Sequence, residues 1–445
     1  MMKKEIKLSL VAAALMSTGF GVQAAEIVAN STGDNNVVKA TQTAPASNGT
    51  TMNIEVVANG AEVTATQTTT SGINTMDIDV LRPLMNGEPQ DNHPGDHTVN
   101  ATQTGGDNGL TISASGNHSL INAEQDGLDN TAFIYNDRGN AYKVGANHNN
   151  VDLSQVGDNN YASIDNDGSD NLGDPDSDTL VGLGINQLGN DNYATITNGG
   201  WNEHNTLTID QSGDFHKAEI DNRFNESNNT LSISQRGGSA ESQWGNEATI
   251  INGRGYDCCG ITYDASNNTI SIDQTGDNFA SVTNEHAGGN TILVTQDGMN
   301  SANVVTDTLS SSHVTVDQKV GGEGDAMNTI DLLVGGDGLS MASLMQDGSG
   351  NQIGGSDARA TAYDGDFAGG DFVLNADNSD FDAAQYGDDN VIVGSVNGSG
   401  HNIDITQDST LAAEGNFAYF NISGTGHTAN ISQTGSANQA FITQQ

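Results

Sequence analysis

The residues best suited to chemistry are the carboxylates of one acidic stretch, DNDGSDNLGDPDSD, at residues 165–178. Oxygen donors alternate there around a glycine turn, and oxygen ligands are what Ca²⁺ prefers in proteins. Asp165, Asp167 and Asp170 are therefore weak candidate calcium ligands, and calcium is the one possible cofactor that the sequence suggests. The stretch lacks the spacing of an EF-hand loop and its terminal Glu, so a solvated acidic loop is the competing interpretation.

The histidines and cysteines form no pattern that is typical of a catalytic or metal site. The ten His include no H-E-x-x-H motif, and the two Cys, Cys258 and Cys259, are adjacent. Adjacent cysteines close only a strained small ring, so we interpret them as a loop feature rather than a disulfide framework. No serine nucleophile elbow or phosphate-binding loop occurs either. We therefore expect that the protein is not an enzyme.

Threonine pairs on strands suggest one further kind of surface. Thr206 and Thr208 could begin a flat array of the ice-binding type, but Ser232 and Ser271, and then Leu293, replace the second Thr in later repeats. The ordinary preference of β-branched residues for strands explains such pairs equally well. Ice binding is therefore a minor hypothesis, which inhibition of ice recrystallisation would test.

The overall composition is unlike that of an ordinary globular domain. The chain has 445 residues, of which 34% are hydrophobic and 5% aromatic, and its formal net charge is −44. Low hydrophobicity with high charge is typical of disorder, unless a strict repeat replaces the large apolar core with stacked units. The negative charge also argues against nucleic acid or an anionic membrane surface as a partner.

The first 24 residues have the pattern of a secretory signal peptide. Lys3, Lys4 and Lys7 precede an apolar run at 8–20, and small residues lead to a cleavage site after Ala24. The apolar run is too short to span a membrane, so we expect secretion without membrane insertion. The mature chain would then be residues 25–445.

A glutamine recurs 15 times along the chain, at intervals that never fall below 22 residues. A constant minimum with variable excess indicates one structural unit of about 22 residues with loop insertions. We expect these insertions near 81–96, 167–183, 236–266 and 347–379. The repeated positions are Gln42, Gln67, Gln103, Gln125, Gln155, Gln187, Gln211, Gln235, Gln274, Gln296, Gln318, Gln346, Gln385, Gln407 and Gln433.

The residues that flank each glutamine repeat as well, and they define a row of two strands. The consensus is [SN]-x5-Q-x-G-x2-N-x-A-x3-[NQ], with the Gly at a turn between the strands. Every anchor falls at an even step within its own strand, so the anchors share one face. The best-defined anchors, which we predict to be structural ladder residues, are Asn205, Gln211, Asn229, Gln235, Asn268, Gln274, Asn284, Asn290, Gln296, Gln433, Asn438 and Gln444.

Stacking of these rows predicts an all-β fold, a β-solenoid of about 15 rows. A buried Gln on its own would be costly, because its amide would lose its hydrogen bonds to water. A Gln beneath another Gln, about 4.8 Å away, can hydrogen-bond to that neighbour instead, and the column of amides then fixes the register. The amides on the inner face are therefore expected to form ladders along the solenoid axis.

This pattern closely resembles the curlin repeat, S-x5-Q-x-G-x2-N-x-A-x3-Q, of the bacterial curli amyloid subunits. Residues 119–136, SLINAEQDGLDNTAFIYN, match every motif position except the last. Residues 427–444, HTANISQTGSANQAFITQ, match every motif position except the first. The resemblance implies a secreted subunit that associates with itself into cell-surface amyloid fibres of a biofilm matrix. It also implies export through the periplasm and an outer-membrane secretion pore, and nucleation by a partner subunit.

The chain departs from the familiar curlins in three ways. It has about three times as many rows, its last anchor is usually Asn, and no separate Gly-rich targeting segment precedes the first row. Whether the chain is a major fibre subunit, a nucleator or a curlin-like adhesin therefore remains open. The alternative function is that of a binding module, a monomeric solenoid adhesin stabilised by calcium.

Overall fold

The computed structural model describes most of the repeat region. The leader at 1–24 lies outside the described residues, as do Asp167, Asp170, Cys258 and Cys259. The described residues are 26–32, 35–44, 50–58, 60–81, 84–85, 88–89, 97–114, 119–135, 149–166, 181–199, 204–222, 228–237, 245–253, 266–284, 288–308, 312–319, 326–336, 340–355, 370–409 and 414–445.

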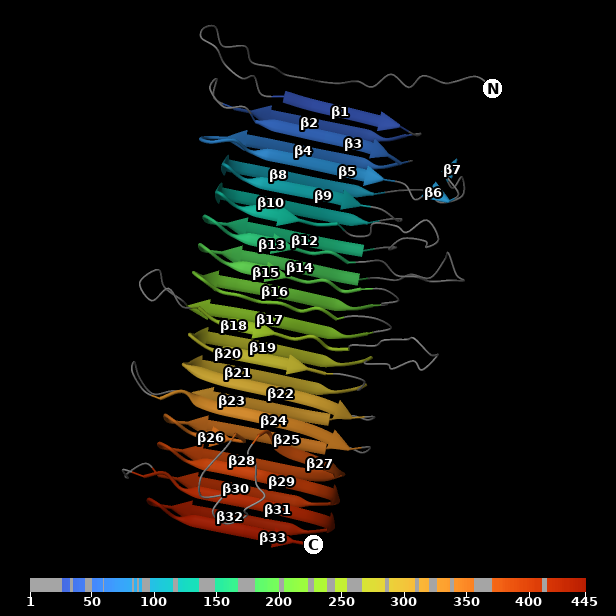
Figure 1. Cartoon of the computed structure of the whole chain (residues 1–445). Helices are drawn as coiled ribbons and strands as arrows, with labels where there is room; N and C mark the ends of the chain where they lie inside the picture. The colour runs from blue at the N-terminus through green and yellow to red at the C-terminus, as the bar shows by residue number, and fades with distance from the viewer. Residues whose placement is uncertain are drawn as a thin grey trace. The chain divides into compact units, whose positions relative to one another are not determined.

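Strands and turns make up the described residues, without any helix, and the strands stack as a β-solenoid. The predicted fold class is therefore confirmed. Within the described ranges there is accordingly no helix that could cross a membrane. The chain divides into two compact units, Met1–Asp214 and Phe215–Gln445, and each contains strands of two sheets (Figure 1).

In the first unit, seven described strands carry the repeated Gln, and seven others form the second sheet. The Gln-bearing strands are β2 (Val37–Thr43), β4 (Glu62–Thr69), β8 (Thr98–Gly106), β10 (Leu120–Leu128), β12 (Asn149–Val156), β14 (Val181–Leu188) and β16 (Thr206–Gly213). The second sheet contains β1 (Glu26–Thr32), β3 (Thr51–Val57), β5 (Thr75–Leu81), β9 (Gly109–Ala114), β11 (Thr131–Phe133), β13 (Tyr161–Ser163) and β15 (Tyr193–Thr195).

The second unit repeats this arrangement with eight described Gln-bearing strands. These are β17 (Thr230–Gly237), β19 (Thr269–Gly276), β21 (Thr291–Gly298), β23 (Ser312–Lys319), β25 (Ser340–Asp347), β28 (Ser379–Tyr386), β30 (Asn402–Asp408) and β32 (Thr428–Thr434). The other sheet contains β18 (Glu247–Thr249), β20 (Phe279–Thr283), β22 (Asn300–Thr308), β24 (Asn328–Gly336), β26 (Gln352–Ile353), β27 (Phe372–Asp377), β29 (Val391–Ser399), β31 (Phe417–Thr425) and β33 (Gln439–Gln444).

Neighbouring strands within each of these sheets are parallel, and their register places each repeated Gln beside the Gln of the next row. Gln125 of β10 pairs with Gln155 of β12, for example, and Gln274 of β19 pairs with Gln296 of β21. A slip of one residue would move every inward side chain to the outside. The register is therefore set by the whole inward face of the row.

The core is the thin layer between the two sheets, and apolar side chains, most of them aliphatic, fill it. In the row of β14 and β15, Leu183, Ile185, Ala194 and Ile196 are each at most 3% exposed, whereas the neighbouring Tyr193 is 41% exposed. Successive side chains of a strand point to opposite faces, which explains this alternation. Buried Gln and Asn side chains occupy other inward positions of this layer.

In 11 of the 15 rows the residue two after the Gln is a glycine, and successive rows lie close together at this position. Gly127 has a φ of 138°, a conformation that residues with a side chain rarely adopt. A Cβ atom on Gly127 would overlap the carbonyl oxygen of Gly157, the equivalent glycine of the next row. Gly127 is thus required both by its backbone conformation and by the stacking.

The sequence predicts insertions across 236–266 and 347–379, but three strands lie inside these ranges. β18 lies within the first range, and β26 and β27 lie within the second. β18 pairs with β20, and β27 pairs with β24 and β29, so all three strands belong to the solenoid rows. In the range expected as the first insertion, 81–96, β6 (Leu84–Met85) and β7 (Glu88–Pro89) form a short antiparallel pair.

Candidate functional site

The repeated glutamines form a continuous hydrogen-bonded ladder within each unit. The Nε2 of each Gln donates to the Oε1 of the next Gln, over distances between 2.7 and 3.0 Å, from Gln42 to Gln211 and from Gln235 to Gln433. The direction is the same at every step, so donor and acceptor ends are distinct. The Oε1 of Gln42 therefore lies on the N-terminal side of its ladder, and the Nε2 of Gln433 lies on the C-terminal side of the other.

Most of these amides also join the two sheets across the core. The Nε2 of Gln274 donates to the backbone oxygen of Glu247 at 3.2 Å, and the Nε2 of Gln296 donates to that of Phe279 at 3.0 Å. Both glutamines are almost completely buried. A buried amide costs free energy unless it is hydrogen-bonded, and these amides have two kinds of partner. Each such Gln therefore connects successive rows and also holds its own sheet to the opposite one.

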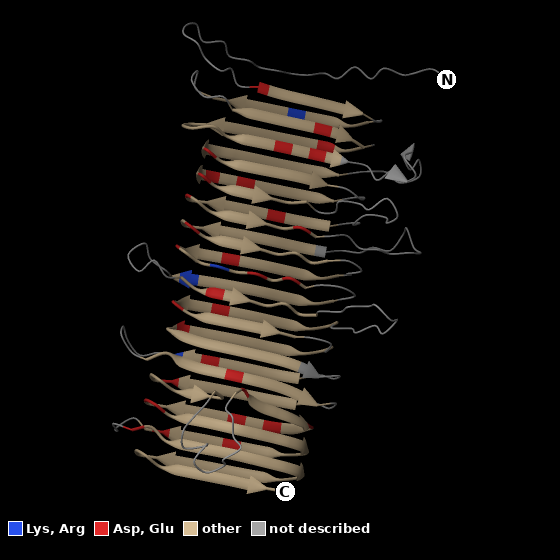
Figure 2. Cartoon of the chain, viewed as in Figure 1, with Lys and Arg blue, Asp and Glu red and all other residues tan. Residues whose placement is uncertain are grey.

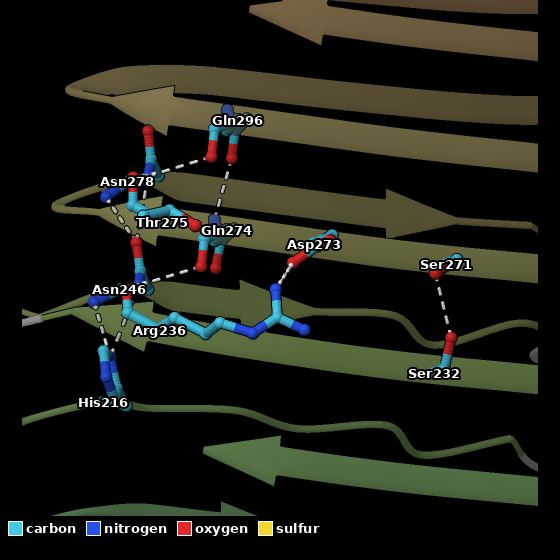
Figure 3. A network of polar contacts seen from close by, with 10 residues as sticks. All are labelled: His216, Ser232, Arg236, Asn246, Ser271, Asp273, Gln274, Thr275, Asn278 and Gln296. Carbon is cyan, nitrogen blue, oxygen red and sulfur yellow. Dashed lines mark hydrogen bonds and ion pairs between the residues drawn. The ribbon is translucent and has the colours of Figure 1, made fainter. Parts of the chain in front are cut away.

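Asparagines at the start of the second strand form another ladder. In the first unit, the Oδ1 of Asn108 accepts the backbone N–H of Asn130 at 2.9 Å, while the Nδ2 of Asn130 donates to the oxygen of Gly157 at 2.7 Å. In the second unit, the Oδ1 of Asn246 accepts the N–H of Asn278 at 2.9 Å (Figure 3). These side chains hydrogen-bond to backbone N–H and C=O groups at the turn, which the hydrogen bonds between strands leave without a partner.

The ladder residues predicted at the start of the first strand act in the same way. Asn229 accepts the backbone N–H of Asn268 at 2.8 Å, and Asn268 accepts that of Asn290 at 2.9 Å. Asn290 accepts the N–H of Ser312 at 2.6 Å. Asn205 is buried, and its backbone oxygen accepts the N–H of Gly182 at 2.9 Å.

Of the remaining predicted ladder residues, Asn284 and Gln444 lie at the ends of second strands, and Asn438 lies directly before β33. Asn284 accepts from Asn252 at 2.7 Å and donates to the Oγ1 of Thr306 at 2.8 Å. Asn438 donates to the Oδ1 of Asn416 at 2.9 Å. Gln444 is half-buried beside Ile422 and lies outside the glutamine ladder.

Sequence reasoning missed several anchors of the second strand, because loops of different length precede them. Asn278 and Asn300 come four residues after their Gln instead of five, and Asn246 comes eleven residues after Gln235. His216 takes the anchor place before Asn246, whose backbone N–H donates to the Nδ1 of His216 at 3.2 Å (Figure 3). The usable signal is the local motif N-x-[AI]-x-[IVLF], which begins at Asn246, Asn278, Asn300, Asn328 and Asn416.

The calcium candidates are not brought together by the described residues. Asp165 is exposed, and its two proposed partners lie outside the described residues. No group of three or more His, Cys, Asp or Glu among the described residues could hold a metal ion.

Most charged side chains of the described residues are at least partly exposed, although Asp221 is buried. Acidic residues far outnumber basic ones along the described strands (Figure 2). Arg236 contacts Asp273 on the neighbouring strand at 2.7 Å (Figure 3). Asp79 lies in register with Glu55. Burial, then the charge of Asp77, and then that of Glu55, raise the pKa of the Asp79 carboxyl above its ordinary value. Acidic side chains of adjacent rows thus repel one another along the solenoid.

Comparison of the chain with protein-family models found no match, and comparison with curated proteins found no similar sequence. The geometry of the ladders is therefore the basis for assigning a function.

Proposed function

We propose that this protein is a secreted structural subunit that assembles into curli-like amyloid fibres on the cell surface. The observation that carries the proposal is the single direction of the glutamine ladder. Gln42 presents its Oε1 on the N-terminal side of the ladder, and Gln433, which donates to Phe417, has a second amide hydrogen on the C-terminal side. A second copy would supply the missing partner at either end, by the same bond that joins the rows within each unit.

The exposure of core side chains at the edge rows supports the same contact. Ile27 and Ala29 of β1 are only half-buried, whereas Met52 and Ile54 of the next strand are buried. Ala440 of β33 is likewise half-buried, whereas Ala418 of β31 is fully buried. Stacking a further row would cover this apolar surface and pair the open strand edge, and both changes favour association.

The curlin resemblance and the leader extend the proposal to the cell. The chain is exported through the periplasm and an outer-membrane secretion pore, and a nucleator subunit starts the fibre. The resulting fibres belong to a biofilm matrix and mediate adhesion and aggregation. The protein has no enzymatic activity in this proposal, and its main partner is another copy of itself.

Electron microscopy and fibre diffraction of the purified mature chain test this function. We expect unbranched fibres with reflections near ~4.8 Å and ~10 Å, the spacings between strands and between sheets. The variant Gln433→Leu should elongate more slowly from seeds, because it removes the donor at the C-terminal edge. Ser432→Ala, on the exposed neighbouring position, is the matched control and should elongate normally. A chain that stays monomeric for days at high concentration, with or without seeds, would exclude the proposal.

A further inference from the structure

Two tyrosines stack directly on each other on the outward face of the first unit. Tyr161 begins β13 and Tyr193 begins β15, and the two residues are register partners in parallel strands. Their ring centroids are 4.8 Å apart, and the ring planes differ by only 4°. Tyr193 is 41% exposed, so a soluble reagent can reach the pair.

The ladders hold the backbones of both tyrosines in place. The carbonyl oxygen of Tyr161 accepts from the Nε2 of Gln187, and that of Tyr193 accepts from the Nε2 of Gln211, each at 3.0 Å. The backbone N–H of Tyr161 donates to the oxygen of Asn192 at 2.8 Å. These bonds fix the two backbones, and the ring stack at 4.8 Å places the two phenols side by side, which is the condition for a high effective concentration.

The neighbouring aromatic residues distinguish this pair from the others. The ring centroid of Phe133 in β11 lies 6.0 Å from that of Tyr161, and the two ring planes differ by 55°. Phe133 has no phenol group. Tyr135 stacks on Phe133, with ring centroids 6.0 Å apart. The contact of Tyr161 with Tyr193, in contrast, stacks two phenol rings face to face.

We propose that Tyr161 and Tyr193 are a site of oxidative cross-linking, at which a peroxidase-type oxidant that uses hydrogen peroxide converts the pair to dityrosine. The cross-link joins two successive rows covalently. It needs only the folded first unit, so it stands independently of fibre formation.

The reaction balances with one peroxide for each cross-link. The oxidant removes one electron and one proton from each phenol, and the two phenoxyl radicals couple through their ortho carbons. The hydrogen on each coupled carbon moves to its oxygen and restores the aromatic ring, while hydrogen peroxide is reduced to two waters. Burial and the nearby Tyr193 and Tyr135 raise the pKa of Tyr161, so its phenol carries the proton that leaves with the electron.

The test treats the full-length mature chain, dilute enough to stay monomeric, with a haem peroxidase and hydrogen peroxide. We expect blue dityrosine fluorescence and one cross-linked peptide pair that contains both tyrosines and has lost two hydrogens. Tyr161→Phe and Tyr193→Phe should each lower the initial fluorescence rate about tenfold, because the preorganised partner is gone. Phe keeps the ring stack, so these variants should fold normally by circular dichroism.

Two controls make the outcome decisive. Tyr386→Phe, in the second unit, should leave the initial rate unchanged, and unfolding the chain in urea should abolish the preference for this peptide pair. Equal rates for Tyr193→Phe and the unchanged chain would overturn the proposal. Peptide maps in which other tyrosines couple first would overturn it too.

Discussion

At the scale of single residues, the turn after the Gln-bearing strand requires a residue without a side chain at Gly127. Gly127→Ala places a Cβ against the Gly157 oxygen at a positive φ, and backbone strain of this kind costs about 1–3 kcal/mol. We therefore expect a lower thermal midpoint. Gly109→Ala is the matched control, since its Cβ would meet only the Thr75 Oγ1 at an ordinary 3.6 Å. Equal midpoints for the two variants would contradict the stacking role of the turn.

The carboxyl of Asp79 predicts how stability depends on pH. Its pKa in the folded protein is raised above 3.8, so the folded chain binds this proton more readily than the unfolded chain. The free energy of unfolding should therefore increase as the pH falls from neutral through the raised pKa, with no further gain below 3.8.

The variant Asp79→Asn isolates this contribution. It should raise the thermal midpoint at neutral pH and weaken the pH dependence above 3.8, because the half-buried repelling charge is gone. Glu26→Gln, at an exposed position at the start of the same sheet, serves as the control and should change neither. An unchanged midpoint in Asp79→Asn at pH 7 would refute the assigned cause.

At the scale of the elements, the glutamine ladder predicts coupling between neighbouring strands. Gln274→Leu removes the bond to Gln296 and leaves buried polar groups on both adjacent rows, at about 1–3 kcal/mol for each unsatisfied group. Gln296→Leu alone removes the same bond, so the double variant loses this bond once, whereas the sum of the two single variants counts it twice. The double variant should therefore lose less stability than the two single variants together, by about 0.5–3 kcal/mol.

A distant pair provides the control for this cycle. Gln274→Leu combined with Gln407→Leu should be additive, because the two residues share no partner. Chemical denaturation of the four proteins in each cycle measures both terms. Additivity in the neighbouring pair would show that each Gln acts alone and that the ladder has no cooperative role.

The strands also show which predictions from local pattern succeed. Gln274 and Ile272 are buried as their even spacing predicts, and Asp273 between them faces solvent. The pattern did not predict that Asp273 pairs with Arg236, because 37 residues separate the two along the chain. Contacts between rows depend on register across loops of variable length, which the alternation within one strand does not contain.

At the scale of the whole molecule, the net charge of −44 should oppose association. Stacked copies bring like charges together, and dissolved salt screens them over about 8–10 Å at physiological ionic strength. We expect the lag time of assembly to shorten with added salt, Ca²⁺ or mild acid. Light scattering from low salt to seawater strength measures this, and a constant lag time would argue against electrostatic control.

The sequence by itself determined the periodic part of this protein. A glutamine at a minimum spacing of 22 residues, with its flanking anchors at even steps, was sufficient to predict parallel in-register rows and buried amides. Stacked rows repeat one local pattern, so the pattern of one row contains the information for its contacts with the next. Inward and outward positions follow from the alternation within each strand.

Only the tertiary structure decided what depends on loops and on the space between sheets. The anchor Asn246 follows an insertion, and its place in the ladder became evident from its bonds rather than from its spacing. The bond from each Gln to the opposite sheet and the contact of Tyr161 with Tyr193 join residues of different strands. Loop length sets the separation of such residues along the chain, whereas the fixed distance between rows sets their separation in space, so the sequence alone does not reveal them.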